Sequence, residues 1–425
     1  MIHERRDASP AFLFDPLLIR REKQTVNPPM LRLALKMLFG DSAKYLMLVA
    51  GIAVATFLMA QQTAVFCGLM SWTKSTLKNV PAPIWVVEER VDQVNETNPL
   101  LDTDVARVRS VSSVAWASPI YSGIQRVRLE NGSFKVIQLI GIDANTLAGA
   151  PAKMLAGDLM KLRLPHSVII DDLGVQRLAR QRGDKVKLND VFEINDQEAR
   201  VVGIADAVTS FTGGPYVWTT YERALQYVPS QRKLLQAVIC APREGVSLDQ
   251  AIADIRRETG LKAFANREAG FGDFLSQMRD EPTTNFNAST VWWYVKNTGI
   301  PISFGITVIV GLMVGIAVSC QTFYSFVLEN MRHLGALKAM GTSNGTLCLM
   351  LITQAFTVGI IGYGIGLLGT AGFAFGALKN EQPPFYMPEF VPFAVLAVVL
   401  GICTLAALLG IWRVSRLEPA MVFRS

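Results

Sequence analysis

The chain has 425 residues, of which 50% are hydrophobic and 18% are charged, with a formal net charge of +6 and a mean hydropathy of +0.30. This composition excludes an ordinary soluble protein, which is less apolar, and a chain made only of membrane spans, which is less charged. It predicts membrane spans joined to a soluble domain.

Residues 1–29 carry basic clusters at positions 5–6 and 20–23 and have little apolar periodicity. We predict a cytoplasmic arm, in which residues 12–19 either belong to an unstructured lead-in or lie against anionic lipid. Over residues 30–44, apolar side chains recur at helical spacing among basic ones, which indicates an amphipathic helix in the membrane interface. With the span that follows, this helix forms the predicted segment 30–70.

Four stretches are long and apolar enough to cross a bilayer as helices, which takes about 20 residues each. They are residues 45–69, 300–327, 347–377 and 390–412, and none contains Asp, Glu, Lys or Arg. The first is preceded by too long a segment, and its apolar run is too long, for a cleavable signal peptide. The last three spans form a predicted transmembrane domain over residues 300–412, followed by a tail over residues 413–425.

The distribution of charge predicts the orientation, because basic loops stay in the cytoplasm. Residues 1–44, 328–346 and 413–425 together carry 13 basic and 7 acidic residues, so the whole net charge of +6 lies on one side. We expect both termini in the cytoplasm and the segment between the first two spans outside it. The pI near 9.0 then reflects topology, and binding to nucleic acid loses its main support.

Residues 71–265 are predicted to form an α+β domain outside the membrane, because short β-type runs alternate there with helical segments. The β-type runs are residues 84–87, 134–142, 167–170, 185–188, 200–204, 216–219 and 234–239, and the helical segments are 102–111, 173–180, 221–227 and 248–259. Ser247 and Gly260 are typical caps for the last helix. A division into two lobes near residues 149–151 is one way to arrange these elements. Cys240 is the one cysteine of this region, so no internal disulfide is expected in the domain.

Residues 266–299 look largely helical and are predicted to form a stalk leading to the second span. The stalk ends in an aromatic and basic cluster that contains Trp292, Trp293, Tyr294 and Lys296. Such side chains favour the headgroup layer, so the cluster is expected to fix the outer end of the span.

Patterns for catalysis or metal binding are missing from the sequence. The three histidines, His3, His166 and His333, fall on separate predicted segments and cannot build one metal site or one acid–base pair. A P-loop-like spacing over residues 68–75 has threonine where the phosphate needs a glycine. The pair Asp171-Asp172 is interpreted as a solvated turn at a strand end. We therefore expect no enzyme activity and no metal or cofactor bound by this chain.

Glycines four residues apart recur in the second and third predicted spans and allow helix backbones to approach closely. The pairs are Gly311 and Gly315, Gly362 and Gly366, and Gly372 and Gly376. Static helix packing explains this spacing. Alternatively, the smooth faces let helices re-pack during a working cycle.

The short loop between the second and third spans carries the most specific pattern. Met331, Leu334, Leu337 and Met340 recur every three residues, which predicts a short helix with an apolar stripe. A helix of this length is not stable by itself, so it needs a surface on which to dock.

This loop resembles the coupling helix of the FtsX/MacB-type permeases of ABC transporters, which has the pattern E-R-x-x-E-I-G-x-L-R-A-x-G. The matching positions are, in order, Glu329, Arg332, Gly335, Leu337, Lys338, Ala339 and Gly341. Residues 413–421 are similar to the end of that family, and residues 139–143, 168–171, 183–186 and 201–204 resemble its periplasmic core domain. The sequence departs from the pattern at His333-Leu334, where a second acid is usual, and at Gln354, which is often Glu.

The resemblance implies a permease subunit of the cell inner membrane, with four transmembrane helices and a large periplasmic domain between spans one and two. A separate ATPase would bind ATP and Mg²⁺ and dock on the loop helix, at Met331 as well as the matching positions. A second permease copy or paralogue is also implied, and in many members a periplasmic adaptor and an outer-membrane channel. The cargo would be an amphiphile moved by mechanotransmission. A lipoprotein-releasing permease and an FtsX-like regulator of cell-wall hydrolases are the alternatives.

Overall fold

The computed structural model describes residues 36–37, 42–96, 98–129, 131–179, 184–229, 235–279, 281, 283–380 and 383–415. The predicted arm, most of the predicted interfacial helix and most of the C-terminal tail lie outside these residues. The chain divides into two compact units. One unit comprises Met1–Val54, Val314–Gly366 and Leu396–Ser425, and the other comprises Ala55–Met313 and Leu367–Val395.

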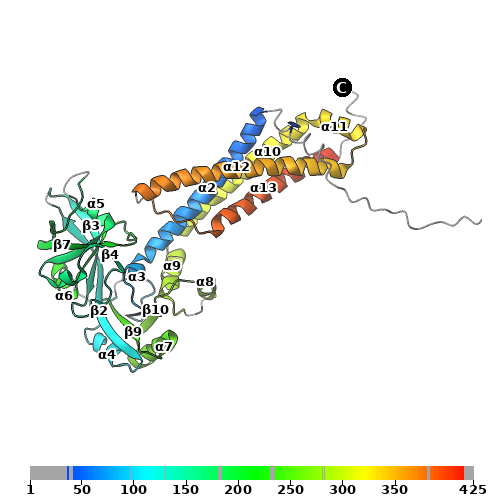
Figure 1. Ribbon diagram of the computed structural model, residues 1–425. Helices are drawn as coiled ribbons and strands as arrows, with labels where there is room; N and C mark the ends of the chain where they lie inside the picture. The colour runs from blue at the N-terminus through cyan, green and yellow to red at the C-terminus, as the bar shows by residue number, and fades with distance from the viewer. Residues whose placement is uncertain are drawn as a thin grey trace, which may run out of the picture. The chain divides into compact units, whose positions relative to one another are not determined.

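Four helices are long and apolar enough to cross a membrane, and each contains one predicted span (Figure 1). They are α2 (Ser42–Thr73), α10 (Ile300–Glu329), α12 (Asn344–Asn380) and α13 (Phe390–Ser415). Helix α2 continues past the predicted end of the first span to Thr73. After Lys74, the short helix α3 (Ser75–Asn79) follows at once.

The chain between α3 and α8 folds around a ten-stranded mixed sheet, which confirms the predicted α+β class (Figure 1). The strand order is β10-β1-β9-β2-β3-β8-β5-β7-β4, and β6 pairs with β2 and β7. The strands are β1 (Ile84–Val87), β2 (Val114–Arg128), β3 (Phe134–Ile142), β4 (Lys153–Gly157), β5 (Ser167–Asp171), β6 (Val191–Ile194), β7 (Gln197–Asp206), β8 (Tyr216–Thr220), β9 (Ala237–Pro242) and β10 (Lys262–Ala265).

Helices cover the sheet and close three hydrophobic clusters. Residues of α4 (Asp104–Ser110) and α7 (Leu248–Thr259) share one cluster with β1, β9 and β10, while α5 (Asp172–Arg177) and α6 (Tyr221–Tyr227) lie beside another built on β3, β5 and β7. The third cluster includes η1 (Leu159–Arg163), α3 and the first residue of α9. The predicted caps of α7 are present, because the Ser247 hydroxyl accepts from the Gln250 N–H and Gly260 has a φ of 69°.

The predicted stalk contains two helices with a break between them. Helix α8 (Phe271–Met278) ends well before α9 (Phe286–Asn297) begins. The buried Asn285 caps α9, where its side-chain oxygen accepts from the backbone N–H groups of Asn287 and Ala288. An N-cap residue adopts a non-helical backbone, which ends any helix running into it.

One of the strand predictions for the outer domain is wrong. Residues 185–188 form no strand, because the Val186 N–H donates to the Val175 carbonyl of α5 instead of to a neighbouring strand. The division into two lobes near residues 149–151 stays a prediction. A Cβ at Gly149 would meet the side chains of Val80, Ile142 and Ile239.

Asp171 is fully buried, and its interpretation as part of a solvated turn is wrong. Its two carboxylate oxygens accept from the Gly174 N–H at 2.7 Å and from the Tyr216 N–H at 2.8 Å. The first contact caps α5 and the second joins β5 to β8. A buried carboxylate is tolerated where such bonds compensate its lost hydration.

Candidate functional site

The loop between the second and third spans forms a separate helix, α11 (Met331–Ala339). It ends in a Schellman motif: the Thr342 N–H donates to the Leu337 carbonyl and the Gly341 N–H to the Lys338 carbonyl, both at 3.1 Å. Gly341 has a φ of 95°, in the left-handed region that favours glycine. The left-handed backbone at this C-terminal cap therefore explains why the last position of the loop motif is a glycine.

The apolar stripe of α11 is buried at some positions and exposed at others. Leu334 is only 2% exposed and Gly335 is buried, whereas Met340 is 75% exposed. Met331, Leu337 and Lys338 are half-buried, and Glu329 and Arg332 are exposed. A partner can therefore reach Met340 and the charged flanks, but Leu334 and Gly335 already pack within this chain.

The six paired glycines of the spans have different surroundings. A Cβ on Gly362 of α12 would lie 2.8 Å from the Ile52 Cβ of α2, and one on Gly311 of α10 would lie 3.2 Å from the Leu58 Cβ. Gly315 and Gly366 are buried. A Cβ at Gly372 or Gly376 would meet no atom within 4 Å.

Other glycines make close helix approaches that the four-residue spacing does not reveal. A Cβ on Gly51 would lie 2.5 Å from Val318, one on Gly359 would lie 2.5 Å from the Cys403 sulfur, and one on Gly410 would lie 3.0 Å from Val327. None of the three has a glycine four residues away, although Gly359 lies three residues before Gly362, so this spacing does not identify them.

A buried polar joint ties the end of the first span to the outer domain. The Tyr216 hydroxyl on β8 bonds the Ser75 hydroxyl at 2.8 Å and the Thr76 hydroxyl at 3.0 Å, both on α3. All three side chains are almost fully buried. Burial raises the pKa of Tyr216 to about 12, so the hydroxyl stays neutral and can bridge both partners.

Asparagine side chains extend this joint. The Asn79 amide pairs with the Val208 backbone, donating at 2.7 Å and accepting at 2.9 Å. Asn95 donates to the Thr73 carbonyl at 2.9 Å, at the last residue of α2, and Asn266 donates to the Leu77 carbonyl at 2.8 Å. Backbone groups that a helix end would leave open are thus satisfied by the domain.

The helix that leads into the second span is anchored in the same domain. Phe286, the first residue of α9, stacks on Phe264 of β10 with ring centroids 4.5 Å apart. The Thr290 hydroxyl accepts from the Val94 N–H at 3.2 Å, and the Ser289 hydroxyl donates to the Asp92 carbonyl at 2.7 Å. Both helices that flank the domain therefore share its core.

An exposed ion pair accompanies the joint. The Glu268 carboxylate lies 2.9 Å from the Lys74 ammonium and 3.5 Å from the Lys78 ammonium. The hydrogen bond from Lys74 holds the pKa of Glu268 below its ordinary value. Because Glu268 is 72% exposed, water and salt screen this contact and it contributes little beside the buried network.

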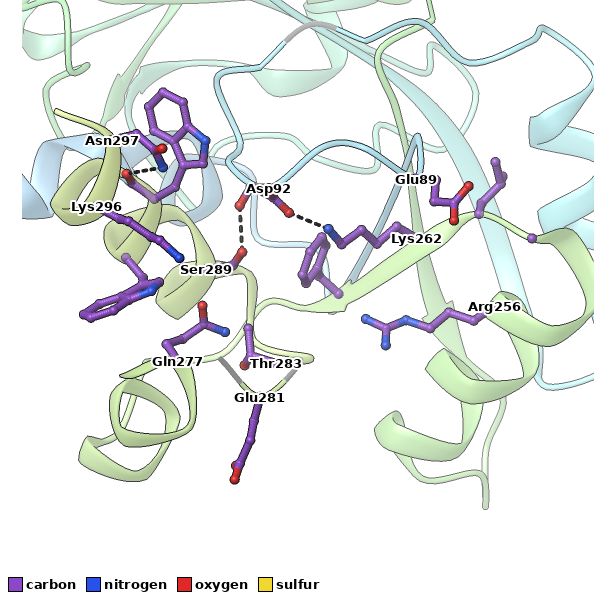
Figure 2. Close-up of a pocket in the computed structure, with 15 residues that line it drawn as sticks. Glu89, Asp92, Arg256, Lys262, Gln277, Glu281, Thr283, Ser289, Lys296 and Asn297 are labelled. Atoms are coloured by element: carbon purple, nitrogen blue, oxygen red, sulfur yellow. Dashed lines mark hydrogen bonds and ion pairs between the residues drawn. The ribbon is translucent and has the colours of Figure 1, made fainter. Parts of the chain in front are cut away.

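A pocket of about 670 Å³ lies beside α9, close in sequence to the start of the second span (Figure 2). Trp292, Trp293 and Lys296 of the predicted aromatic cluster line it, together with Arg256 and Lys262. Figure 2 shows the Lys262 ammonium paired with the Asp92 carboxylate, at 2.5 Å. Glu89, Asp92 and Glu281 line it too and balance the three basic side chains. Aromatic rings beside charged groups of both signs suit an amphiphile.

Within the described part of the chain, no cluster of three or more His, Cys, Asp or Glu side chains could hold a metal ion. The predicted loop helix is present, but the joint was not predicted from the sequence. The sequence gives no clear signal of it, because Trp72 and Lys74 are the aromatic and charged residues with which a membrane helix usually ends.

Four apolar helices, a loop helix after the second, and an α+β domain after the first define the class of membrane permeases. Two family models agree. The MacB-like periplasmic core domain matches residues 46–258, just over half of the chain, and the FtsX-like permease C-terminal matches residues 300–419. The chain belongs to the FtsX/MacB-like family of ABC transporter permeases, which work with an ATPase partner.

Solved structures with low sequence identity match just under half of this chain. The extracellular domain of the noncanonic ABC-type transporter YknZ from Gram-positive bacteria is 11% identical, with 43% of this chain and 99% of that chain covered and a TM-score of 0.32. The periplasmic region of MacB from Actinobacillus actinomycetemcomitans is 13% identical, with 48% and 96% covered and a TM-score of 0.35. A permease domain from Porphyromonas gingivalis is 15% identical, with 49% and 99% covered and a TM-score of 0.29. A search of curated proteins gives no match.

Proposed function

We propose that the chain is a mechanotransmission subunit, which turns ATP hydrolysis by a separate ATPase into movement of its outer domain. It lies in the cell inner membrane with both termini in the cytoplasm, and it works as two copies or with a paralogue. ATP and Mg²⁺ bind to the ATPase. The movement drives export of an amphiphilic substrate, and a periplasmic adaptor and an outer-membrane channel are the expected partners on the far side.

The observation that carries this proposal is α11. It is a helix of nine residues with its own C-terminal cap, and it directly follows one long apolar helix and precedes another. Met340 is exposed beside it, although a large apolar side chain in water gains nothing for this chain alone. A groove on an ATPase would cover Met340 and move α10 and α12 with the loop.

The pocket at α9 supports an amphiphilic cargo. It places Trp292 and Trp293 near charged side chains of both signs, so apolar and polar surfaces occur together. A lipoprotein-releasing permease fits this chemistry as well, because a lipidated polypeptide is also an amphiphile. An FtsX-like regulator would need no such pocket. Neighbouring genes separate these functions, since an adaptor gene favours export and a hydrolase gene favours regulation.

The test is whether the ATPase encoded beside this chain copurifies with it when Met340 is changed. In Met340→Lys, the lost apolar burial is about 2 kcal/mol, which weakens the complex by at least roughly tenfold. Lysine suits the C-terminus of a helix, so α11 itself is expected to fold. The matched control is Met278→Lys at the end of α8, where the methionine is 65% exposed on the outer domain. Equal copurification of both variants would refute docking at α11.

A further inference from the structure

A second cavity, of about 560 Å³, lies inside the outer domain, and none of its twelve lining residues is charged. It is in the size range of sites for small molecules. Four glutamines line it: Gln93, Gln125, Gln138 and Gln236, from the loop after β1, from β2, from β3 and from the residue before β9. The segments that carry them are distant in sequence and meet only in the folded domain.

Two of these amides offer donors to the cavity. The Gln93 Oε1 accepts from the Asn95 N–H at 2.8 Å, and the Gln236 Oε1 accepts from the Ser122 N–H at 2.6 Å. A backbone N–H can only donate, so these contacts fix which end of each amide faces the wall. In the part of the chain that the structure describes, no partner is recorded for the two remaining NH₂ groups.

The other two amides offer acceptors. The Gln125 Nε2 donates to the Tyr121 hydroxyl at 3.1 Å, and the Gln138 Nε2 donates to the Ser122 hydroxyl at 3.0 Å. Their carbonyl oxygens have no recorded partner among the described residues. Gln93, Gln125 and Gln138 are each only 7% exposed, and their unpaired amide groups face the cavity, where a ligand can replace water as their partner.

We infer that this cavity binds a neutral saccharide. A sugar carries many hydroxyl groups that donate and accept, which matches a wall with NH₂ and carbonyl groups and no charge. It also has apolar C–H faces, and the rings of Phe211 and Tyr294, 4.8 Å apart, line the same cavity.

The cavity shares side chains with the joint at the first span. Asn95 lines the cavity and donates both to the Thr73 carbonyl at 2.9 Å and to the Tyr294 hydroxyl at 3.4 Å. A sugar that bonds Asn95 therefore contacts a side chain that is bonded to the end of α2. A sugar that packs on Tyr294 contacts α9 directly. Binding at this site does not depend on the identity of the transported cargo.

The experiment is saturation-transfer NMR on the full chain in a detergent without a sugar headgroup, because glycosidic detergents would compete. The probes are cellobiose, maltose and diacetylchitobiose, with glucuronic acid as a charged comparison. We expect at least one neutral disaccharide to bind, and the double variant Gln93→Leu with Gln138→Leu to weaken it by at least about tenfold. The matched control, Gln277→Leu, lies in the other pocket and is expected to bind as the unchanged protein does.

Absence of binding by all three disaccharides at about 10 mM would overturn the inference, because binding weaker than this is too weak to be specific. Binding that is unchanged in the double variant would overturn it too. Near-UV circular dichroism checks that the double variant is folded. If it is not, Phe211→Ala replaces it, because Phe211 is half-buried on a loop and contributes the apolar wall.

Discussion

Gly341 gives α11 a defined end, and its φ of 95° is the reason that a side chain is costly there. An alanine in the left-handed region costs about 1 kcal/mol, which is about a fivefold change in an equilibrium. In Gly341→Ala we therefore expect about fivefold faster hydrogen exchange over residues 336–342, measured by mass spectrometry. Gly372→Ala, at a helical position with open space, is the control and should exchange as the unchanged protein does. Equal rates in both variants would contradict the Schellman cap.

Asp171 holds α5 and β8 together from a fully buried position. Asp171→Ala removes the N-cap and leaves the Gly174 and Tyr216 N–H groups without acceptors, so we expect a loss of about 3 kcal/mol. The measurement is denaturant unfolding followed by tryptophan fluorescence, since the buried Trp218 lies on β8. Asp172→Ala, next to it but exposed, should cost less than about 1 kcal/mol. Similar losses in both would contradict this role for Asp171.

Tyr216 makes the joint sensitive to alkaline pH. Burial raises its pKa from 10.0 to about 12, so the unfolded chain releases the phenol proton at lower pH than the folded one. Stability is therefore fully present below pH 10 and falls by about 2 kcal/mol as the pH rises to 12. Tyr216→Phe should cost about 1 kcal/mol at neutral pH through the lost bonds to Ser75 and Thr76. It should also have a smaller alkaline loss in urea titrations, and an unchanged alkaline loss would contradict this assignment.

Helices α2 and α12 approach closely at Gly362, where a Cβ would lie 2.8 Å from Ile52 and 3.0 Å from the Val49 carbonyl oxygen. Gly362→Leu must push the helices apart, so we expect a lower melting temperature in detergent and a loss of about 2 kcal/mol. Gly372→Leu on the same helix is the matched control, because a Cβ there meets no atom within 4 Å. Equal melting temperatures for both variants would show that the approach at Gly362 is not required.

The sequence predicts an element well where apolar residues recur with one clear spacing, helical or alternating, and poorly where the spacing is mixed. The run at β3 and the helices α6 and α7 have the predicted bounds, since each has a clear apolar pattern and recognisable ends. Strand β2 was missed because its 15 residues include Pro119, Gly123 and several polar side chains. It is also the strand that pairs with β3, β6 and β9, so its conformation comes from its partners.

The site was predictable only where its residues are neighbours in sequence. The spacing of Leu334 and Met340 predicts α11, but it cannot tell that Leu334 packs within the chain while Met340 is exposed. The joint joins Ser75 to Tyr216, which are 141 positions apart, so no local pattern contains it. The sugar cavity has the same origin, because its glutamines meet only after β2, β3 and β9 have paired.

The helices that precede and follow the outer domain in sequence, α3 and α9, pack into its core. Buried bonds from α3 and packing from α9 place the ends of these segments in the domain core. Under the proposed function, we therefore expect the domain to move with these two helices. The short break at residues 298–299, between α9 and α10, is the place where the chain leaves regular helix before the second span. We expect the chain to bend at residues 298–299, and α9 to move as one rigid body with the outer domain.

The most direct test measures the outer domain while the ATPase binds nucleotide. A spin label at Glu244→Cys, on the exposed turn before α7, reports the distance between two permease copies by double electron–electron resonance, after the five native cysteines have been replaced. With an ATPase that binds but does not hydrolyse ATP, the distance distribution should shift by several ångströms on adding ATP, and the shift should disappear in Met340→Lys. A distribution that ATP leaves unchanged while the ATPase stays bound would contradict mechanical coupling through α11.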